Sequence, residues 1–475
     1  MQVDPSTFED FELNHSLFDL RIDDVAIWER IRFRAFREIQ KQNGMGQAHT
    51  GIEKNWRDYT RGFWLFLRNL VIKNPYFGGK HDILYVGHHR RKKREDGYWW
   101  DIYCDPIHEA CGQSYLHVES PHRLEHHTPA KTSNLRYLDL AQYAGTIQQM
   151  LGVNEPTIPA IKRRKLKDAQ QAIRREFDTD VDLLSRAKEQ LHVRRTTLPF
   201  YEYFLKRVDP ELVVMIVSYI RETLVEACDN LGIPVVELQH GVIYEHHFGY
   251  SYPDPRTKET FPDYLLTFGD FWKDAVKFPI PDERVISVGY PYLEQSIGEY
   301  KDVKSKEQLL FISQGTIGRQ LSKFAMEAER HPDINHEIVY KLHPGEYNRW
   351  EAEYPWLLEA DFEIVDDSDR QLYQLFAESS AQIGVGSTAV YEGLAFGLET
   401  FVYECPGSSV LQPLVDEDTA NLVSSANDLA SLLGHRKVSF DREYYFTPGA
   451  TEQACTVIER LADEGTVYRR SVIEN

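Results

Sequence analysis

The residues of this chain best suited to chemistry lie in polar turns of its C-terminal half. Gly386-Ser387-Thr388 follows a short apolar run from about Gln382 to Val385 and precedes a stretch of small and apolar residues. Gly386 allows a ligand to approach the backbone closely, and Ser387 is a favourable helix N-cap. Because a helix N-terminus carries partial positive charge, this turn is suited to hold a phosphate. An ordinary capped β–α turn is the simpler alternative.

Two further polar turns follow apolar runs of the same half. Gln314-Gly315-Thr316 comes after Leu309–Ile312, and His343-Pro344 comes after the run that ends at Lys341. In open parallel sheets, ligands bind outside the carboxyl ends of the strands. We therefore expect all three turns to line one crevice.

Three side chains near these turns have types that suit a nucleotide. Glu392, about one turn into the helix after Ser387, can accept hydrogen bonds from a ribose diol. Lys341 and His343 can offset the charge on a leaving phosphate without a metal. His343 could equally be a packing residue before a proline turn. The sequence predicts a donor-binding set made of Gln314, Gly315, Thr316, Lys341, Gly386, Ser387, Thr388 and Glu392, with His343 as a catalytic residue.

A histidine in the first half of the chain is a candidate general base. The apolar run Pro234 to Leu238 leads into Gln239-His240-Gly241. Histidine is the side chain best suited to exchange a proton near neutral pH. We predict that His240 is catalytic, with His246 and its neighbours Glu245 and His247 as alternatives. A histidine that only hydrogen-bonds its own loop is the simpler explanation.

A basic loop follows the first strand expected after residue 81. It reads HHRRKKR over residues 88–94 and should face the same crevice as His240. A solvated charge run is the commonest explanation of such a loop, and recognition of an anionic acceptor, such as a phospholipid-linked one, is the functional explanation. The predicted acceptor-binding residues are Arg90, Arg91, Gln239 and His246.

The sequence predicts no metal site and no cofactor. Cys104, His108, Cys111 and His117 are of ligand type, but their spacing matches no established zinc pattern. We expect a metal-independent site. Because Walker, G-x-G-x-x-G and G-x-S-x-G motifs are also missing from the sequence, kinase, dehydrogenase and common hydrolase functions are disfavoured.

Composition limits the classes of partner. The net charge of −20 over 475 residues argues against nucleic acid, whose phosphates attract the opposite sign. Five cysteines fit a reducing compartment better than a disulfide framework. The acidic first residues predict no secretory signal, and no apolar run is long enough to span a membrane. We expect a cytoplasmic protein.

The order of expected elements predicts an α/β protein with two Rossmann-like domains facing a cleft. Alternating strands and helices indicate parallel sheets. A dense aromatic stripe between Trp56 and Ile72, with Arg57, Arg61 and Arg68 beside it, fits domain packing or a peripheral contact with the inner face of the membrane. The predicted parts are an N-terminal helical region (1–80), an acceptor domain (81–295) with a helical insertion at about 142–203, a donor domain (296–450), and a C-terminal helix and tail (451–475).

These motifs resemble those of GT-B glycosyltransferases of surface-polysaccharide synthesis. The resemblance covers roughly residues 210–405 and rests on Gln239-His240-Gly241, Lys341-Leu342-His343-Pro344 and Gly386-Ser387-Thr388. It includes bacterial sialyltransferases, capsule Kdo transferases and teichoic-acid glycerophosphotransferases. The resemblance implies that His343, Ser387 and Thr388 hold the donor phosphate and that His240 is the base. The acidic base motif common in sialyltransferases has no match here.

Sequence and resemblance together predict a metal-independent glycosyltransferase of surface glycan or polysaccharide biosynthesis. It would move a sugar from a nucleotide-sugar donor to a hydroxyl of a glycan or lipid-linked acceptor. The alternatives are an isomerase like the sugar-nucleotide 2-epimerases, a glycerophosphotransferase of the CDP-glycerol type, and a nucleotide-sugar-binding scaffold protein without activity.

Overall fold

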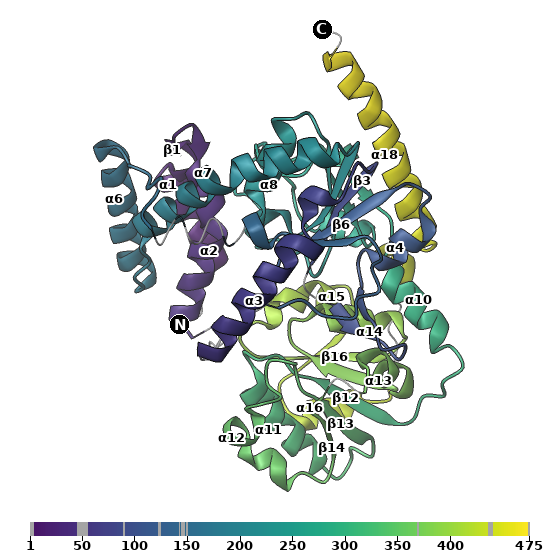
Figure 1. The fold of residues 1–475 in the computed structure, drawn as a ribbon. Coiled ribbons are helices and arrows are strands. Elements are labelled where there is room, and N and C mark those ends of the chain that lie inside the picture. The colour runs from purple at the N-terminus through teal and green to yellow at the C-terminus, as the bar shows by residue number, and fades with distance from the viewer. Residues whose placement is uncertain are drawn as a thin grey trace. The chain divides into compact units, whose positions relative to one another are not determined.

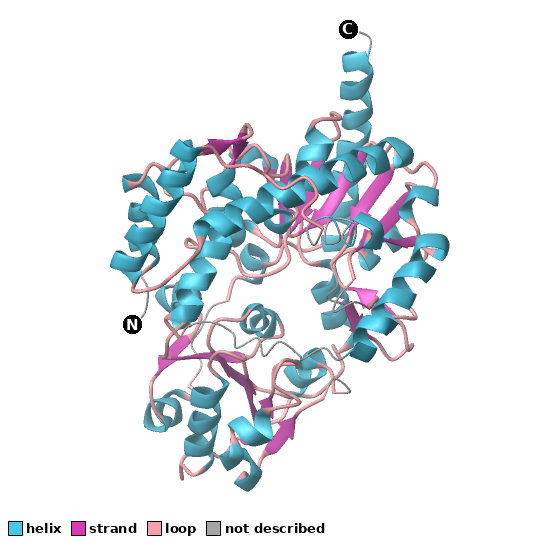
Figure 2. Cartoon of the chain, turned by 60° about the vertical axis from the view of Figure 1, so that its left-hand side comes forward, coloured by secondary structure: helices cyan, strands magenta, loops and turns pink. Residues whose placement is uncertain are grey.

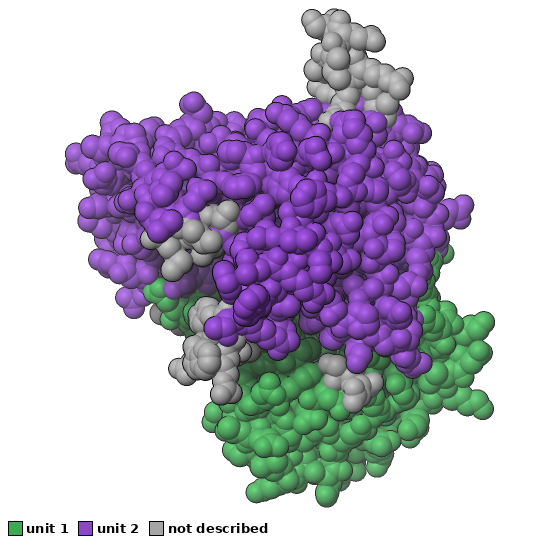
Figure 3. All heavy atoms as spheres, in the orientation of Figure 1, with its two compact units in different colours: residues 1–2, 40–49, 293–446 green, residues 3–39, 50–292, 447–475 purple. Residues whose placement is uncertain are grey.

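The chain forms two compact units in a computed structural model (Figure 3). The N-terminal unit consists mainly of residues 3–39 and 50–292 with the closing segment from 447, and the C-terminal unit mainly of residues 293–446. The structure describes residues 4–44, 56–88, 91–121, 125–141, 143, 148, 151–367, 370–435 and 440–473.

The N-terminal unit is built on a seven-stranded sheet in which every neighbouring pair is parallel (Figure 1). The strand order is β11-β10-β9-β8-β3-β6-β7. The chain starts in the middle at β3, builds outward to β7, and then returns to the other side of β3 with β8. The strands are β3 (Ile83–Val86), β6 (Tyr115–Glu119), β7 (Leu135–Tyr137), β8 (Leu212–Ile216), β9 (Val235–Leu238), β10 (Tyr264–Thr267) and β11 (Val285–Ser287).

The C-terminal unit repeats this plan with six parallel strands. Their order is β14-β13-β12-β15-β16-β17, which is 3-2-1-4-5-6 when the strands are numbered along the unit. This is the order of the dinucleotide-binding fold, with the reversal of direction between the first and fourth strands. The strands are β12 (Gln308–Ile312), β13 (Glu337–Lys341), β14 (Glu363–Val365), β15 (Ala381–Gly384), β16 (Glu399–Tyr403) and β17 (Asn421–Val423).

Helices flank both sheets, as Figure 2 shows by colour. Because side chains alternate along a strand, Leu84 and Val86 of β3 pack with α7 and α8 in one core, whereas Tyr85 points to the other face and contacts His108 of α4. In the C-terminal unit, Leu309 and Phe311 of β12 pack against the apolar side of α11. The predicted α/β class with two Rossmann-like units is confirmed.

The remaining elements connect or cover the sheets. The helices of the N-terminal unit are α1 (Pro5–Asn14), α2 (Ile27–Gln42), α3 (Trp56–Ile72), α4 (Asp105–Ala110), α6 (Ala160–Phe177), α7 (Leu183–Val208), α8 (Glu222–Asp229), α9 (Asp270–Asp274) and α18 (Ala450–Ile473). Those from residue 291 to 446 are α10 (Pro291–Glu299), α11 (Gly318–Glu329), α12 (Trp350–Glu353), α13 (Leu372–Glu378), α14 (Thr388–Ala395), α15 (Gln412–Asp416), α16 (Ala426–Leu432) and α17 (Arg442–Tyr445). Two short antiparallel pairs are β1 (Arg21–Ile22) with β2 (Val25–Ala26), and β4 (Arg91–Lys93) with β5 (Trp99–Asp101).

The helical N-terminal region and the helical insertion share one hydrophobic core. Side chains of α1, α2, α6 and the first half of α7 bury each other, with Phe248 from a later loop among them. At the centre of this core, the Arg32 guanidinium forms a two-pronged ion pair with Glu12, with both side chains fully buried. Arg32 also donates to the carbonyls of Phe248 and Ser251, and Trp28 donates to Glu12. This buried charge network fastens the cluster to the loop of Phe248 and Ser251, and the ion pair between Arg30 and Glu226 joins α2 to α8.

The expectation that the cysteines form no disulfide is wrong. Cys111, which follows α4, is bonded to Cys455 on α18, 344 positions further along the chain. The disulfide joins the C-terminal helix to the N-terminal unit. Sparse, widely separated cysteines carry no signal for such a pair, because pairing depends on the folded distance between their Cα atoms, here 5.4 Å.

The described helices are too short or too polar to cross a membrane. The longest, α7 and α18, carry many charged side chains.

Replacing Glu12 by Gln is expected to destabilise the N-terminal unit by about 3 kcal/mol, because it leaves the Arg32 guanidinium buried beside a neutral partner. The exposed pair Arg21–Glu259 is a matched control, and Glu259→Gln should change the free energy of unfolding by less than about 0.5 kcal/mol. Urea unfolding followed by tryptophan fluorescence measures both, since Trp28 contacts Glu12. Equal effects of the two substitutions would contradict a stabilising role for the buried Arg32–Glu12 ion pair.

Candidate functional site

The turns after β12 and β15 are hydrogen-bonded to each other at the point where the strand order of the C-terminal unit reverses. The Gln314 side-chain amide donates to the Gly386 carbonyl and accepts from the Gly386 N–H, both at 3.1 Å. This reciprocal pair fixes the relative position of the two turns. A switch point of this kind is where open α/β sheets bind ligands.

The helix that starts at this point is held unusually close to its strand. The Ser387 hydroxyl caps α14 by accepting from the Ala389 N–H at 3.3 Å. A Cβ on Gly393 would lie 2.0 Å from Oε1 of Gln382 in β15, and one on Gly384 would lie 2.6 Å from Val390. The two glycines therefore permit the close strand–helix contact. Gly386, Ser387 and Thr388 remain half-buried, so the first turn of α14 is accessible to a ligand.

A buried carboxylate, Glu346, connects the turns after β12 and β13. It accepts from the Ser313 hydroxyl at 3.1 Å and from the His343 N–H at 2.8 Å, and it also accepts from the Tyr354 hydroxyl at 2.8 Å. Gly318, the first residue of α11, lies against it, because a Cβ there would be 2.1 Å from Oε1. One side chain thus sets the position of two strand ends.

A separate hydrogen bond defines the tautomer of His343. Its Nδ1 accepts from the Gly345 N–H at 3.0 Å, so the proton of the neutral ring lies on Nε2. The ring is half-buried, with Nε2 as its donor nitrogen. Arg349 adds a second brace, since its guanidinium donates to the carbonyls of Gly345 (2.9 Å) and Gly315 (3.4 Å). The turns after β12, β13 and β15 are therefore brought together by direct contacts.

The other donor-side residues have distinct surroundings. Thr316 is exposed at the turn after β12, and Glu392 is largely buried on α14. The Lys341 ammonium turns toward β14, where it donates to the Tyr347 hydroxyl at 2.9 Å and to the Asp367 carbonyl. Burial lowers the pKa of Lys341 to about 8. Lys341 therefore belongs to the β13–β14 side of the sheet and not to the switch point.

In the N-terminal unit, His240 follows β9 and lies between two tyrosine hydroxyls. The Tyr219 hydroxyl is 3.4 Å from its Nε2, and the Tyr250 hydroxyl is 3.4 Å from its Nδ1. Tyr250 donates its proton to the buried carboxylate of Glu237, so it presents a lone pair to an Nδ1–H of His240. The basic nitrogen is then Nε2. Burial raises the pKa of both tyrosines, which stay protonated.

Three of the four residues predicted to bind the acceptor lie within the described part of the chain. Gln239 is buried, and its amide bonds the Gly241 carbonyl (2.8 Å) and the Phe268 N–H (2.7 Å), which makes it a brace of this loop. His246 faces Glu9 of α1 at 3.5 Å, and hydrogen bonding to that carboxylate raises its pKa. Arg90 lies outside the described residues.

Arg91 does not face solvent as its basic loop predicted. Its guanidinium is buried, donates to Glu119 at 2.8 Å and lies 3.7 Å from Asp105. The loop folds back as the hairpin β4–β5, which turns Arg91 inward. An arginine inside a basic run is indistinguishable in sequence from its solvated neighbours.

Two acids were missed by sequence reasoning. Glu237 lies in the apolar run Val235–Leu238. Because a buried carboxylate is rare without a hydrogen-bond partner, its presence in this run predicts such a partner. Glu346 stands in a polar loop and gave no such signal.

Comparisons with known proteins give a fold-level likeness only. No protein-family model matches the chain, and no curated protein matches its sequence. Among solved structures, UDP-GlcNAc 2-epimerase from Methanocaldococcus jannaschii is 11% identical, with a TM-score of 0.45 over 80% of this chain and 99% of its own. The wall teichoic acid polymerase TagF is 11% identical (TM-score 0.43; 86% and 99%), and the glycotransferase of kitacinnamycin is 11% identical (0.42; 83% and 97%). At such values the similarity carries no conclusion about activity, which has to be inferred from this chain's own residues.

Replacing Gly318 by Ala is expected to destabilise the C-terminal unit by about 2 kcal/mol and to weaken nucleotide binding at the predicted donor set, because the new methyl group displaces Glu346 and with it the turn of His343. Gly298 in α10 has open space around its Cβ position, so Gly298→Ala should leave stability and binding unchanged or improve them. Thermal unfolding and nucleotide titration of the two variants provide the comparison. Normal nucleotide affinity in a folded Gly318→Ala protein would show that Glu346 does not support the nucleotide site.

Proposed function

We propose that this protein is a glycosyltransferase that moves a sugar from a nucleotide-activated donor to an acceptor hydroxyl in surface glycan or polysaccharide biosynthesis. The C-terminal unit would bind the donor, and the N-terminal unit would activate the acceptor.

The hydrogen-bonded pair of turns at the switch point of the C-terminal sheet carries the proposal. Gln314 fixes the position of Gly386, which lies directly before α14. Ser387 caps this helix, and Gly386, Ser387 and Thr388 are half-exposed. Backbone N–H groups at a helix N-terminus bind phosphate oxygens, and the helix dipole favours their charge. The Nε2–H of His343, whose turn is joined to β12 through Glu346, supplies a further donor. These groups form a phosphate site in which no divalent ion is required.

The N-terminal unit supports the second half of the reaction. Glu237 and Tyr250 orient His240 so that its Nε2 is basic, which suits a general base. The 3.4 Å contacts are long for hydrogen bonds, as is common before a substrate is bound. The Tyr103 hydroxyl donates to the His240 carbonyl at 2.7 Å and fixes the backbone of the loop.

In the proposed step, an acceptor oxygen forms a bond to the anomeric carbon while the bond from that carbon to the donor's phosphate oxygen breaks. The proton of the acceptor hydroxyl passes to Nε2 of His240. The negative charge that develops on the departing phosphate is stabilised by the α14 N-terminus and by His343. Groups of this kind, positioned before the reaction, usually contribute the largest catalytic effect.

A lipid-linked acceptor is favoured by the outer face of α3. Phe63, Trp64, Leu67, Val71 and Ile72 are exposed along the helix, with Trp64 70% and Val71 75% accessible. The opposite face packs inward, where Phe66 contacts Tyr143 and Asn69 bonds Asp139. Arg61 and Arg68 are exposed beside the apolar residues. An amphipathic helix with apolar and basic residues on its outer side is suited to the surface of an anionic membrane.

Two histidine substitutions separate donor binding from acceptor activation. His343→Ala should weaken nucleotide binding roughly 10- to 100-fold, the value of one lost charge-assisted hydrogen bond. His240→Ala should leave nucleotide affinity within about twofold and lower transfer by roughly 10²–10⁴. His331→Ala is the matched control, since the His331 ring, in the same unit as His343, bonds Asn427 and the Asp333 N–H, neither of which belongs to the predicted donor set.

Titration with CMP, CDP, UDP and GDP identifies the nucleotide that the protein binds. Transfer is then measured as release of that nucleotide from its nucleotide sugar in the presence of glycan or lipid-linked acceptors. Wild-type nucleotide affinity in His343→Ala would remove this histidine from the site. Conversion of the donor sugar without any acceptor would show an epimerase instead.

The double variant Phe63→Ser/Trp64→Ser should reduce sedimentation with vesicles of anionic phospholipid at least about tenfold, because two large apolar side chains no longer enter the bilayer interface. Leu358→Ser is the control, since Leu358 is 62% exposed on the C-terminal unit. Equal sedimentation of all three proteins would contradict a membrane role for α3.

A further inference from the structure

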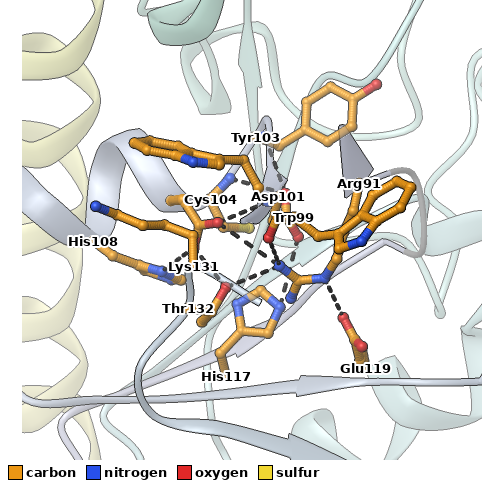
Figure 4. A network of polar contacts seen from close by, with 12 residues as sticks. Arg91, Trp99, Asp101, Tyr103, Cys104, His108, His117, Glu119, Lys131 and Thr132 are labelled. Carbon is orange, nitrogen blue, oxygen red and sulfur yellow. Dashed lines mark hydrogen bonds and ion pairs between the residues drawn. The ribbon is translucent and has the colours of Figure 1, made fainter. Parts of the chain in front are cut away.

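Four side chains of metal-ligand type converge in the N-terminal unit, beneath the turn that follows β3 (Figure 4). The Cys104 sulfur and one ring nitrogen each of His108 and His117 lie within 4.8 Å of one another. The Asp101 Oδ2 is 3.6 Å from Nε2 of His117. Asp101 ends β5, Cys104 directly precedes α4, His108 lies within α4, and His117 lies in β6. Only the folded domain brings these four side chains together.

Four polar atoms of this group are buried and have no hydrogen-bond partner among the described residues. The Asp101 and His117 side chains and Cys104 are fully buried, and the His108 side chain is 3% exposed. Within the described residues, neither ring nitrogen of His117 has a hydrogen-bond partner, and the same holds for Nε2 of His108 and Oδ2 of Asp101. Four such atoms in one place are unusual, because each buried polar group without a partner costs on the order of 1–3 kcal/mol.

The surroundings orient the His108 ring toward this group. Nδ1 of His108 is 3.3 Å from Asp105, which directs Nε2 of the ring inward. Asp105 is itself held by the Thr132 hydroxyl at 2.6 Å and the Asp101 N–H at 2.7 Å. A carboxylate behind a histidine is the usual support of a metal-binding imidazole. A Cβ on Gly87 would lie 2.1 Å from Nε2 of His117 and 2.7 Å from Oδ2 of Asp101, so glycine keeps that side open.

We propose that Asp101, Cys104, His108 and His117 bind one Zn²⁺ ion. One sulfur, two nitrogens and one oxygen form a donor set of the kind zinc takes, whereas Ca²⁺ and Mg²⁺ prefer oxygen alone. In a tetrahedral zinc site the ligand atoms are about 3.5 Å apart, given bonds of roughly 2.0–2.3 Å. The Asp101–His117 separation of 3.6 Å already fits, and the ligand atoms of Cys104, His108 and His117, within 4.8 Å of one another, require shifts of about 1 Å or less. Asp101 lies outside that three-residue group, so its carboxylate has to turn toward Cys104 and His108 to complete the set.

The charges balance around this ion. The Cys104 thiolate and the Asp101 carboxylate neutralise Zn²⁺. Two guanidinium groups lie near this ion: Arg91, which is paired with Glu119 and Asp105, and Arg221, which donates to the Gly87 carbonyl.

The ion would be structural, because the protein supplies all four ligands and the site is closed to solvent. It would fix the start of α4, whose other end is fixed by the Cys111–Cys455 disulfide. The Tyr103 N–H donates to Asp101, and the Tyr103 hydroxyl donates to the His240 carbonyl. The site therefore supports the loop of His240 without taking part in chemistry, and it stands independently of the proposed function.

Metal analysis of the untagged full chain tests the proposal. The wild-type protein, purified without chelator, should contain about one Zn²⁺ per chain, and Cys104→Ser and His117→Ala should each lose most of it. Two control variants should keep the zinc. Cys111→Ser removes a cysteine that forms the disulfide with Cys455, and Cys228→Ser removes another buried cysteine. Zinc loss in Cys111→Ser but not in Cys104→Ser would overturn the assignment.

A second measurement does not depend on the folding of variants. Wild-type protein stripped with chelator and titrated with Co²⁺ should take up one ion, show the absorption of a cobalt–thiolate bond, and regain thermal stability. A wild-type protein that is purified without zinc and binds neither Zn²⁺ nor Co²⁺, with an unchanged unfolding temperature, would refute the site.

Discussion

The buried carboxylate of Glu346 is the constraint on which the candidate donor site depends. It receives hydrogen bonds from the end of β12, from the turn after β13 and from Tyr354, and the lack of a side chain on Gly318 makes room for it. A charged group without solvent is stable only where its hydrogen bonds are satisfied. The three donors therefore cannot move apart without exposing or stranding the charge. Two strand ends from separate parts of the sequence are thereby held in one arrangement.

The two sheets use the same strand order and therefore place a switch point in each unit. In the C-terminal unit it lies between β12 and β15, where Gln314 bonds Gly386. In the N-terminal unit it lies between β3 and β8, where Arg221 donates to the Gly87 carbonyl at 2.8 Å. Each fold leaves a gap between two turns at this point, and each sequence closes it with a side chain that binds backbone.

The sequence was sufficient to predict the fold class and the strand ends that carry polar residues. Apolar runs bounded by Gly, Ser and Pro predicted β12, β13 and β15 within a residue or two, since periodicity and turn chemistry are local. It was not sufficient for Arg91, Cys111 or Glu346, whose roles depend on contacts far along the chain. Lys341 was placed correctly at a strand end. The turn that its side chain approaches could not be predicted, because it depends on which strands are neighbours in the sheet. The assignment of roles to His240, His343 and the donor set stays a prediction.

Both candidate sites share a way of limiting motion, and this bears on how the proposed enzyme would work. His240 has its backbone held by Tyr103 and its ring by the Tyr250–Glu237 pair, and His343 has its backbone held by Glu346 and its ring by Gly345. In each case the acid is buried, whereas the histidine is half-exposed. Burying Glu237 and Glu346 lowers stability compared with an apolar core, since charges lose their hydration. A catalytic group gains from that cost only when it must be oriented before its substrate arrives, because an orientation fixed in advance requires no rearrangement during the reaction. The placement of buried acids behind exposed histidines is therefore better explained by preorganised chemistry than by stability alone.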